Sequence, residues 1–166
     1  MIGFKLITEH SSSGGPAGAL ARTFLRFLQF CLGLAVCGLY GQDLSAASQA
    51  GVYMDAKWVY AVTVGGIAAS TCILYLVIHF MSWIKSHHLF SWDAVIFILW
   101  VALFGIFGKI YISANPTPEQ HGQWRMKRAV WVDLVNMLLW FVSAVWGGVV
   151  FWKARRGGKA GELEKA

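Results

Sequence analysis

The polar side chains that could carry chemistry in this sequence lie near the ends of long apolar segments. Lys109 stands about one helical turn from the end of one segment, and Asp133 stands at a similar depth near the start of the next. Because a charge in hydrocarbon is stabilised by an opposite charge, we predict an ion pair between Lys109 and Asp133. Asn136 follows one turn later, and its amide is expected to add a hydrogen bond between helices.

A second contact between charges is expected at the other ends of these segments. Asp93 begins the third apolar segment, and Arg22 and Arg26 flank the start of the first. For both pairs a structural role is favoured over a catalytic one. The adjacent His87 and His88 have no further ligand close in sequence, and a metal site needs more than two. We therefore expect no catalytic residue, no cofactor and no bound metal.

The elements that must position these side chains are four apolar runs at about 24–40, 58–84, 90–112 and 130–152. Crossing about 30 Å of hydrocarbon takes about 20 apolar residues, and spans of this kind are helical because lipid offers no partner for backbone groups. A content of 57% hydrophobic and 13% charged residues agrees. The fold class we predict is an all-α integral membrane protein, a bundle of four transmembrane helices.

The domain organisation follows from these spans. We predict an N-terminal tail at 1–21, a transmembrane domain at 22–152 and a basic C-terminal tail at 153–166. The positive-inside rule favours an M-shaped topology with both termini in the cytosol, because the tails, the 85–91 turn and the start of the first span with Arg22 and Arg26 hold nine of the 14 Lys and Arg residues. The tail cations expected to contact anionic lipid are Lys153, Arg155, Arg156 and Lys159.

Small residues recur at helical spacing within the predicted spans. Such a pattern lets helix backbones approach closely where lipid removes the hydrophobic drive for association. It predicts tight packing, and it gives weaker support to a homo-oligomer. The glycines of this pattern are Gly65, Gly66, Gly105, Gly108, Gly147 and Gly148.

Several segments between about Arg22 and Trp152 carry a family resemblance by their order and spacing: Arg26 and Gln29, Gly38-Leu39-Tyr40-Gly41, Trp58-Val59-Tyr60, Trp92-Asp93, Trp100, Phe104-Gly105-Ile106-Phe107-Gly108, Trp131-Val132-Asp133-Leu134-Val135-Asn136 and Trp140. Together they resemble the fungal branch of the MARVEL-type, or membrane-associating, four-span family. The resemblance implies an M-shaped bundle with cytosolic ends, acting in membrane apposition, lipid-domain organisation at eisosome-like furrows of the plasma membrane, or vesicle traffic. It carries over no catalytic residue.

Three functions follow as hypotheses. The first is a non-enzymatic membrane organiser, whose partners are membrane lipids (sphingolipid, sterol or anionic lipid) and other integral membrane proteins. The second is an accessory subunit of a larger assembly such as a transporter, pump or polysaccharide synthase. The third and weakest is a small transporter or lipid-modifying enzyme. We expect no nucleic acid partner despite the net charge of +6. We expect a plasma-membrane location, with endomembrane vesicles as the alternative.

Overall fold

The structure, a computed structural model, describes residues 15–81 and 89–163, without the side chains at several helix ends. Within these residues the chain is all-helical. The four helices are α2 (Gly15–Gln49), α3 (Ala56–Met81), α4 (Leu89–Tyr111) and α5 (His121–Leu163).

The connection between α2 and α3 is fixed by caps at both ends. After α2, Gly51 takes the left-handed conformation with φ of 64°. The N–H of Val52 donates to Ala47 O at 3.1 Å and that of Gly51 to Ser48 O at 3.2 Å, which is the Schellman pattern. Asp55 then caps α3, because its carboxylate accepts from the Lys57 N–H at 3.0 Å.

The Lys57 ammonium also contacts Asp55, at 3.1 Å. The backbone N–H and the ammonium of Lys57 lower the pKa of Asp55 below its ordinary value, because both stabilise the charged carboxylate.

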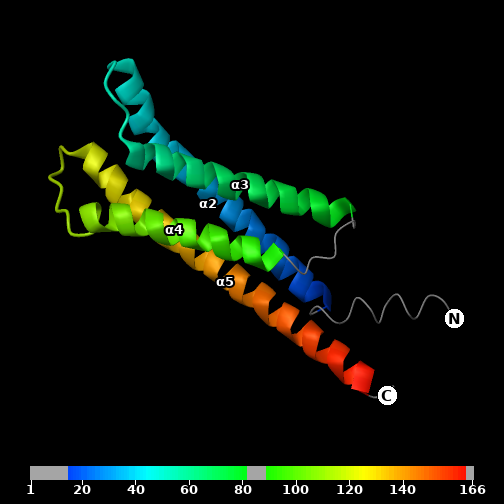
Figure 1. Cartoon of the computed structure of the whole chain (residues 1–166). Helices are drawn as coiled ribbons and strands as arrows, with labels where there is room; N and C mark the ends of the chain where they lie inside the picture. The colour runs from blue at the N-terminus through cyan, green and yellow to red at the C-terminus, as the bar shows by residue number, and fades with distance from the viewer. Residues whose placement is uncertain (1–14, 82–88, 164–166) are drawn as a thin grey trace.

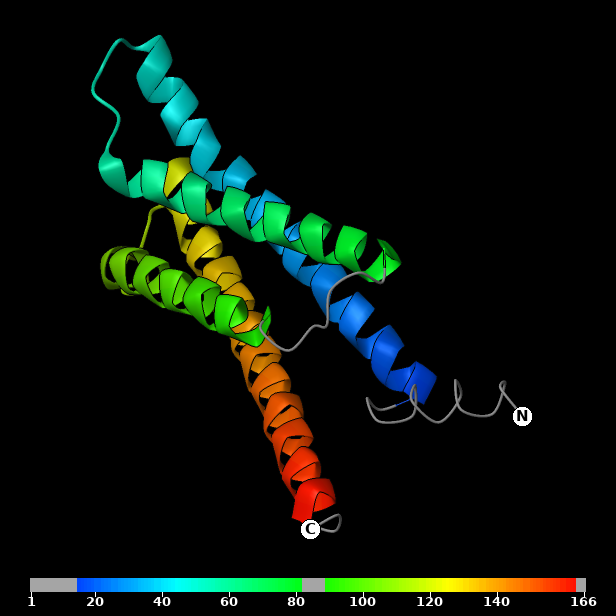
Figure 2. The same ribbon diagram turned by 45° about the vertical axis from the view of Figure 1, so that its right-hand side comes forward.

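The helices run antiparallel and form a bundle with one loose seam. Figure 1 places the start of α2 and the end of α5 at one end, which we call the termini end. The connections at 50–55 and 112–120 lie at the other, the loop end. Contacts are most extensive between α4 and α5 and between α2 and α3, and much less extensive between α3 and α4. Figure 2 shows α3 and α4 standing apart. The 82–88 connection between α3 and α4 lies outside the described residues.

One face of each helix points inward. Buried residues recur every three or four positions, as expected for one face of a helix with 3.6 residues per turn. Large side chains fill the centre of the bundle: Trp100, Trp140, Tyr40, Phe107, Ile96 and Leu103 are among the least exposed.

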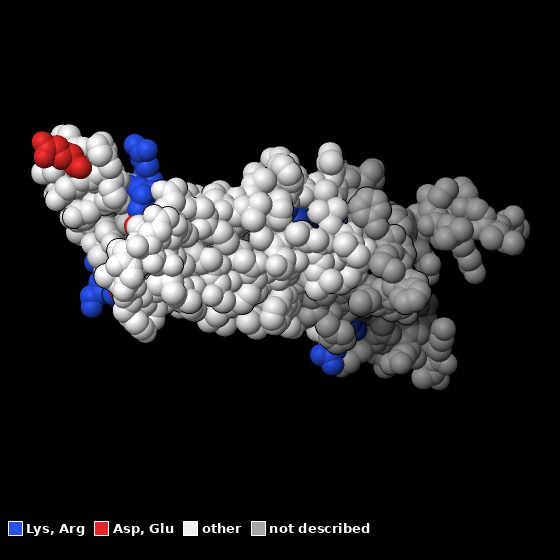
Figure 3. Space-filling view, turned by 90° about the horizontal axis from the view of Figure 1, so that it is seen from above, with Lys and Arg blue, Asp and Glu red and all other residues white. Residues whose placement is uncertain are grey.

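The outward faces are strongly apolar. Ile98 is 63% exposed and Phe24 61% exposed, which suits a protein whose surroundings are lipid rather than water. Figure 3 shows a wide middle band almost free of charged residues, with Lys, Arg, Asp and Glu gathered toward the ends. All four helices are long and apolar enough to cross a membrane.

Two helices extend well beyond the predicted spans. At about 1.5 Å per residue, the 35 residues of α2 reach about 52 Å and the 43 residues of α5 about 65 Å. The predicted tail boundary at residue 21 therefore falls inside α2, and most of the predicted C-terminal tail continues α5. The cause is plain: the span prediction stopped where apolar residues stopped, whereas a helix can continue into water.

Candidate functional site

A network at the termini end ties all four helices together. Arg26 Nη2 lies 2.5 Å from Asp93 Oδ2, and Tyr75 Oη donates to the other oxygen of Asp93 at 3.0 Å. The guanidinium also donates to Gln29 Oε1 at 3.0 Å. Gln29 in turn donates to Ser143 Oγ of α5 at 2.9 Å. The predicted contact between Asp93 and an arginine is confirmed, with Arg26 as the partner.

Aromatic rings enclose the same guanidinium. Arg26 Cζ lies 4.5 Å from the ring centroid of Tyr75 and 5.2 Å from that of Trp140. Cation–π contacts of this kind gain strength when the cation is desolvated. The arginine is thus held by a carboxylate, an amide and two ring faces, so its most evident role is structural.

The predicted ion pair between Lys109 and Asp133 is wrong. Asp133 is fully buried, and its contact is with α2, where Tyr40 Oη donates to Asp133 Oδ2 at 2.7 Å. Lys109 is exposed. The reason is rotational: Phe107 points inward, and a residue two positions later lies about 200° around the helix, so Lys109 faces outward.

Asn136 and its neighbours form a second departure from expectation. Asn136 is fully buried, yet neither its side-chain oxygen nor its nitrogen has a hydrogen-bond partner among the described residues. The same holds for Asp133 Oδ1 and for the indole nitrogens of Trp100 and Trp140. The expected interhelical hydrogen bond of Asn136 is therefore not formed by a described protein group.

The predicted packing glycines divide into two groups. A Cβ on Gly65 would lie 2.9 Å from both Gly33 O and Cys37 Sγ of α2, so α2 and α3 touch here through their backbones. By contrast, a Cβ on Gly66, Gly105 or Gly148 would meet nothing within 4 Å. These three glycines therefore do not mediate close packing within the chain. For Gly66 the reason is again rotation, because it follows Gly65 by one residue and so faces a different direction.

The two remaining glycines of the pattern also make no close interhelical contact that we can describe. A Cβ on Gly108 would meet side chains of its own helix, with Ile112 Cδ1 nearest at 3.3 Å. Gly147 is half-buried.

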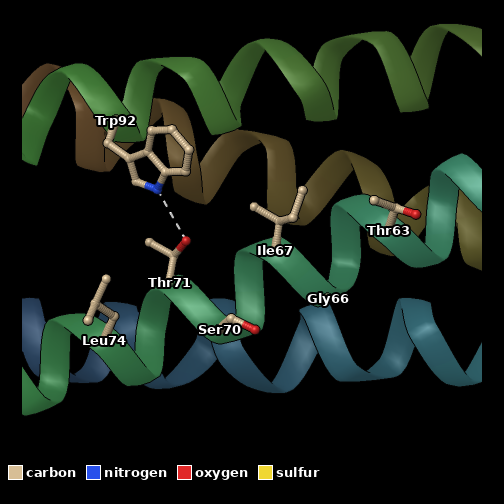
Figure 4. A pocket seen from close by; sticks show the side chains of 7 residues that line it. All are labelled: Thr63, Gly66, Ile67, Ser70, Thr71, Leu74 and Trp92. Carbon is tan, nitrogen blue, oxygen red and sulfur yellow. Dashed lines mark hydrogen bonds between the residues drawn. The ribbon is translucent and has the colours of Figure 1, made fainter.

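A lateral groove lies along the loose seam between α3 and α4. Its volume is about 450 Å³, within the size range of small-molecule sites. In Figure 4 the indole of Trp92 points from α4 toward α3, where its N–H donates to Thr71 Oγ1 at 3.2 Å. Gly66 and Ser70 form part of the floor. The lining residues are Thr63, Gly66, Ile67, Ser70, Thr71, Leu74 and Trp92. Sequence reasoning had noted Gly66 as part of a packing pattern but had missed the groove.

A second hollow, of about 480 Å³, lies at the loop end. It is lined by Leu39 of α2 and by His121, Trp124, Arg125 and Arg128 of α5. Sequence reasoning did not single out these residues as a site, although the cationic and aromatic side chains follow one another at positions i, i+3, i+4 and i+7 on one helix face.

The cations of the predicted C-terminal tail belong to the helical extension of α5. Arg156 Cζ lies 3.5 Å from the ring centroid of Trp152, and Arg155 Cζ lies 5.7 Å from that of Phe151. Lys153 is exposed. The side chain of Lys159 lies outside the described residues. Lys153, Arg155 and Arg156 therefore form a basic rim on the helical extension of α5.

These features define an all-helical bundle with four helices apolar enough to span a membrane, a polar interior contact network, and two surface hollows. Comparisons with protein-family models, with curated proteins and with solved structures find no match. The resemblance to MARVEL-type proteins stays a prediction.

Proposed function

We propose that this protein is a non-enzymatic organiser of a membrane, which gathers lipids or neighbouring membrane proteins along its lateral groove. One observation carries the proposal: the bundle presents its groove sideways, on the α3–α4 seam, while its centre is filled by large side chains such as Trp100 and Trp140. A groove facing the hydrocarbon meets lipid chains and the helices of other proteins before it meets any water-soluble molecule.

The lining favours a lipid or a helix as occupant. Gly66 leaves open space beside the backbone, Ser70 adds a hydroxyl, and Trp92 supplies a broad aromatic wall whose indole is 46% exposed. Small residues at this spacing allow a close approach, and an aromatic ring contributes a large contact area. The basic rim at Lys153, Arg155 and Arg156 would add attraction to anionic lipid of about 1 kcal/mol per cation. We propose the plasma membrane as its location, with endomembrane vesicles as the alternative.

A matched pair of variants tests the groove. Gly66→Leu fills it, whereas Gly148→Leu places the same side chain on α5, and neither position has a neighbour within 4 Å of its Cβ. Proteins extracted with their surrounding lipid in polymer discs are compared for enriched lipids, and tagged proteins are compared for clustering in cells. We expect Gly66→Leu to lose lipid enrichment and to disperse, and Gly148→Leu to behave as the wild type. If lipid enrichment and clustering are unchanged in Gly66→Leu, the groove is not the surface that gathers lipids or neighbouring proteins.

The alternative, an accessory subunit of a larger membrane assembly, is favoured by a separate observation. Gly66, Gly105 and Gly148 lie on three different helices, and each leaves open space at its Cβ, so a partner helix could approach several faces. Purification in mild detergent at native abundance separates the two functions. A larger protein present in stoichiometric amount supports the subunit, while a monomeric or self-associated species supports the organiser.

A further inference from the structure

The hollow at the loop end is built by the first two turns of α5 and one residue of α2. His121, Trp124, Arg125 and Arg128 lie on one helix face, because residues three and four positions apart are neighbours on a helix. Leu39 closes the hollow from the side of α2. The lining thus joins cationic groups to an apolar wall.

The charges of this hollow are only partly matched. Arg125 is paired with Asp43 at 2.5 Å and donates to Gln42 Oε1 at 3.0 Å, yet its buried Nε–H has no partner among the described residues. Arg128 is exposed and forms no ion pair with a described residue. One unmatched positive charge, that of Arg128, therefore lines the hollow beside the paired guanidinium of Arg125.

The backbone adds to this positive character. The hollow lies at the start of α5, and the first turn of that helix holds no acidic residue. The first backbone N–H groups of a helix lack intrahelical acceptors and carry partial positive charge, so they attract anions. The helix terminus alone would not define a site, but here it coincides with two arginines and an open hollow.

The apolar part of the lining indicates that the anion belongs to a lipid and is not a free ion. Trp124 is 41% exposed, and tryptophan prefers the membrane interface, where one side of the ring meets hydrocarbon and the other meets water. Leu39 and Trp124 would contact the beginning of an acyl chain while the arginines contact a phosphate above it. A free phosphate ion would leave the apolar wall unused.

We propose that this hollow binds the phosphate of an anionic phospholipid, with Arg128 as the main donor and Trp124 and Leu39 against its acyl chains. The inference extends the proposed function and shares with it only the insertion of the helices in a bilayer. It does not depend on the α3–α4 groove, so clustering through Gly66 can fail while this binding persists.

The test uses the full-length protein in discs of phosphatidylcholine with added phosphatidylglycerol, followed by detergent exchange and native mass spectrometry of retained lipid. The wild type should retain phosphatidylglycerol and not phosphatidylcholine. Arg128→Gln should retain less phosphatidylglycerol, because the loss of one interfacial cation lowers the affinity for the anionic lipid about fivefold. Lys109→Gln is the matched control, since Lys109 is an exposed cation in the last turn of α4 at the same end.

Three outcomes decide the matter. Loss in Arg128→Gln and in Trp124→Ala, with retention in Lys109→Gln, supports the lipid site. Equal retention in Arg128→Gln and Lys109→Gln overturns it, as does equal retention of phosphatidylcholine by the wild type. Displacement of the lipid by inorganic phosphate, together with unchanged retention in Trp124→Ala, assigns the hollow to a free anion and overturns the lipid assignment.

Discussion

Replacing Arg26 with methionine tests whether the ion pair at the termini end holds the bundle together. The guanidinium lies 2.5 Å from Asp93, whose side chain is 3% exposed. Methionine keeps much of the aliphatic length but removes the charge, so the carboxylate stays buried with the Tyr75 hydroxyl as its remaining donor among the described residues. Removing one partner of a buried pair costs about 3–5 kcal/mol, and we expect the free energy of unfolding to fall by that amount.

A double-mutant cycle with a matched surface pair gives this prediction its control. Steric trapping of the protein in bicelles measures the free energy of unfolding of each variant. Arg26→Met combined with Asp93→Leu should recover most of the loss, since replacing both charges with apolar groups is often close to neutral. Lys57→Met breaks a pair that is 50% and 45% exposed, and it should cost less than about 1 kcal/mol. Strictly additive losses in the cycle, or equal losses for Arg26→Met and Lys57→Met, would refute the reasoning.

Three further predictions follow from individual contacts. Gly65→Ala should destabilise by about 1–3 kcal/mol, because the new Cβ would lie 2.9 Å from a backbone oxygen of α2; Gly66→Ala should be neutral or stabilising under the same unfolding assay. Tyr40→Phe removes the donor to buried Asp133 and should cost about 1–3 kcal/mol, whereas an unchanged stability would show that the carboxyl finds another partner. Asp55→Ala should lower the stability near neutral pH through loss of the cap. Because the pKa of Asp55 is lowered on folding, its contribution is present above the ordinary Asp pKa and is lost as the pH falls through the lowered value, so the two proteins should converge in acid.

The four helices and the Arg26–Asp93 contact could be predicted because both depend on depth along a helix. Long apolar runs identify helices that can cross a membrane, and charges at equal depth near neighbouring ends are natural partners. The ends of α2 and α5 could not be predicted from hydropathy. Both helices continue into polar sequence, and hydropathy does not distinguish a polar stretch of helix from a tail.

The Lys109–Asp133 pair failed because depth does not fix the direction of a side chain. Rotation about the helix axis does, at about 100° per residue. The inward faces of α2 and α5 could have been read from the spacing of Tyr40 with Arg26 and Gln29, and of Asp133 with Trp140 and Ser143. That comparison would have suggested Tyr40 as the partner of Asp133. The two hollows were out of reach, because they depend on how far neighbouring helices separate.

The interior network and the lateral groove are linked by the rotation of α3. Tyr75 reaches Asp93 only when its face of α3 points inward, and the same rotation places Gly65 against α2 and Gly66 beside α4. A turn of α3 by one residue, about 100°, would break the tyrosine contact and would move Gly66 away from Trp92. The directional contacts of the interior therefore determine which face the protein offers to the membrane. A groove variant such as Gly66→Leu can thus alter binding at the groove without disturbing the bundle. Loss of an interior contact is expected to alter both the binding and the bundle.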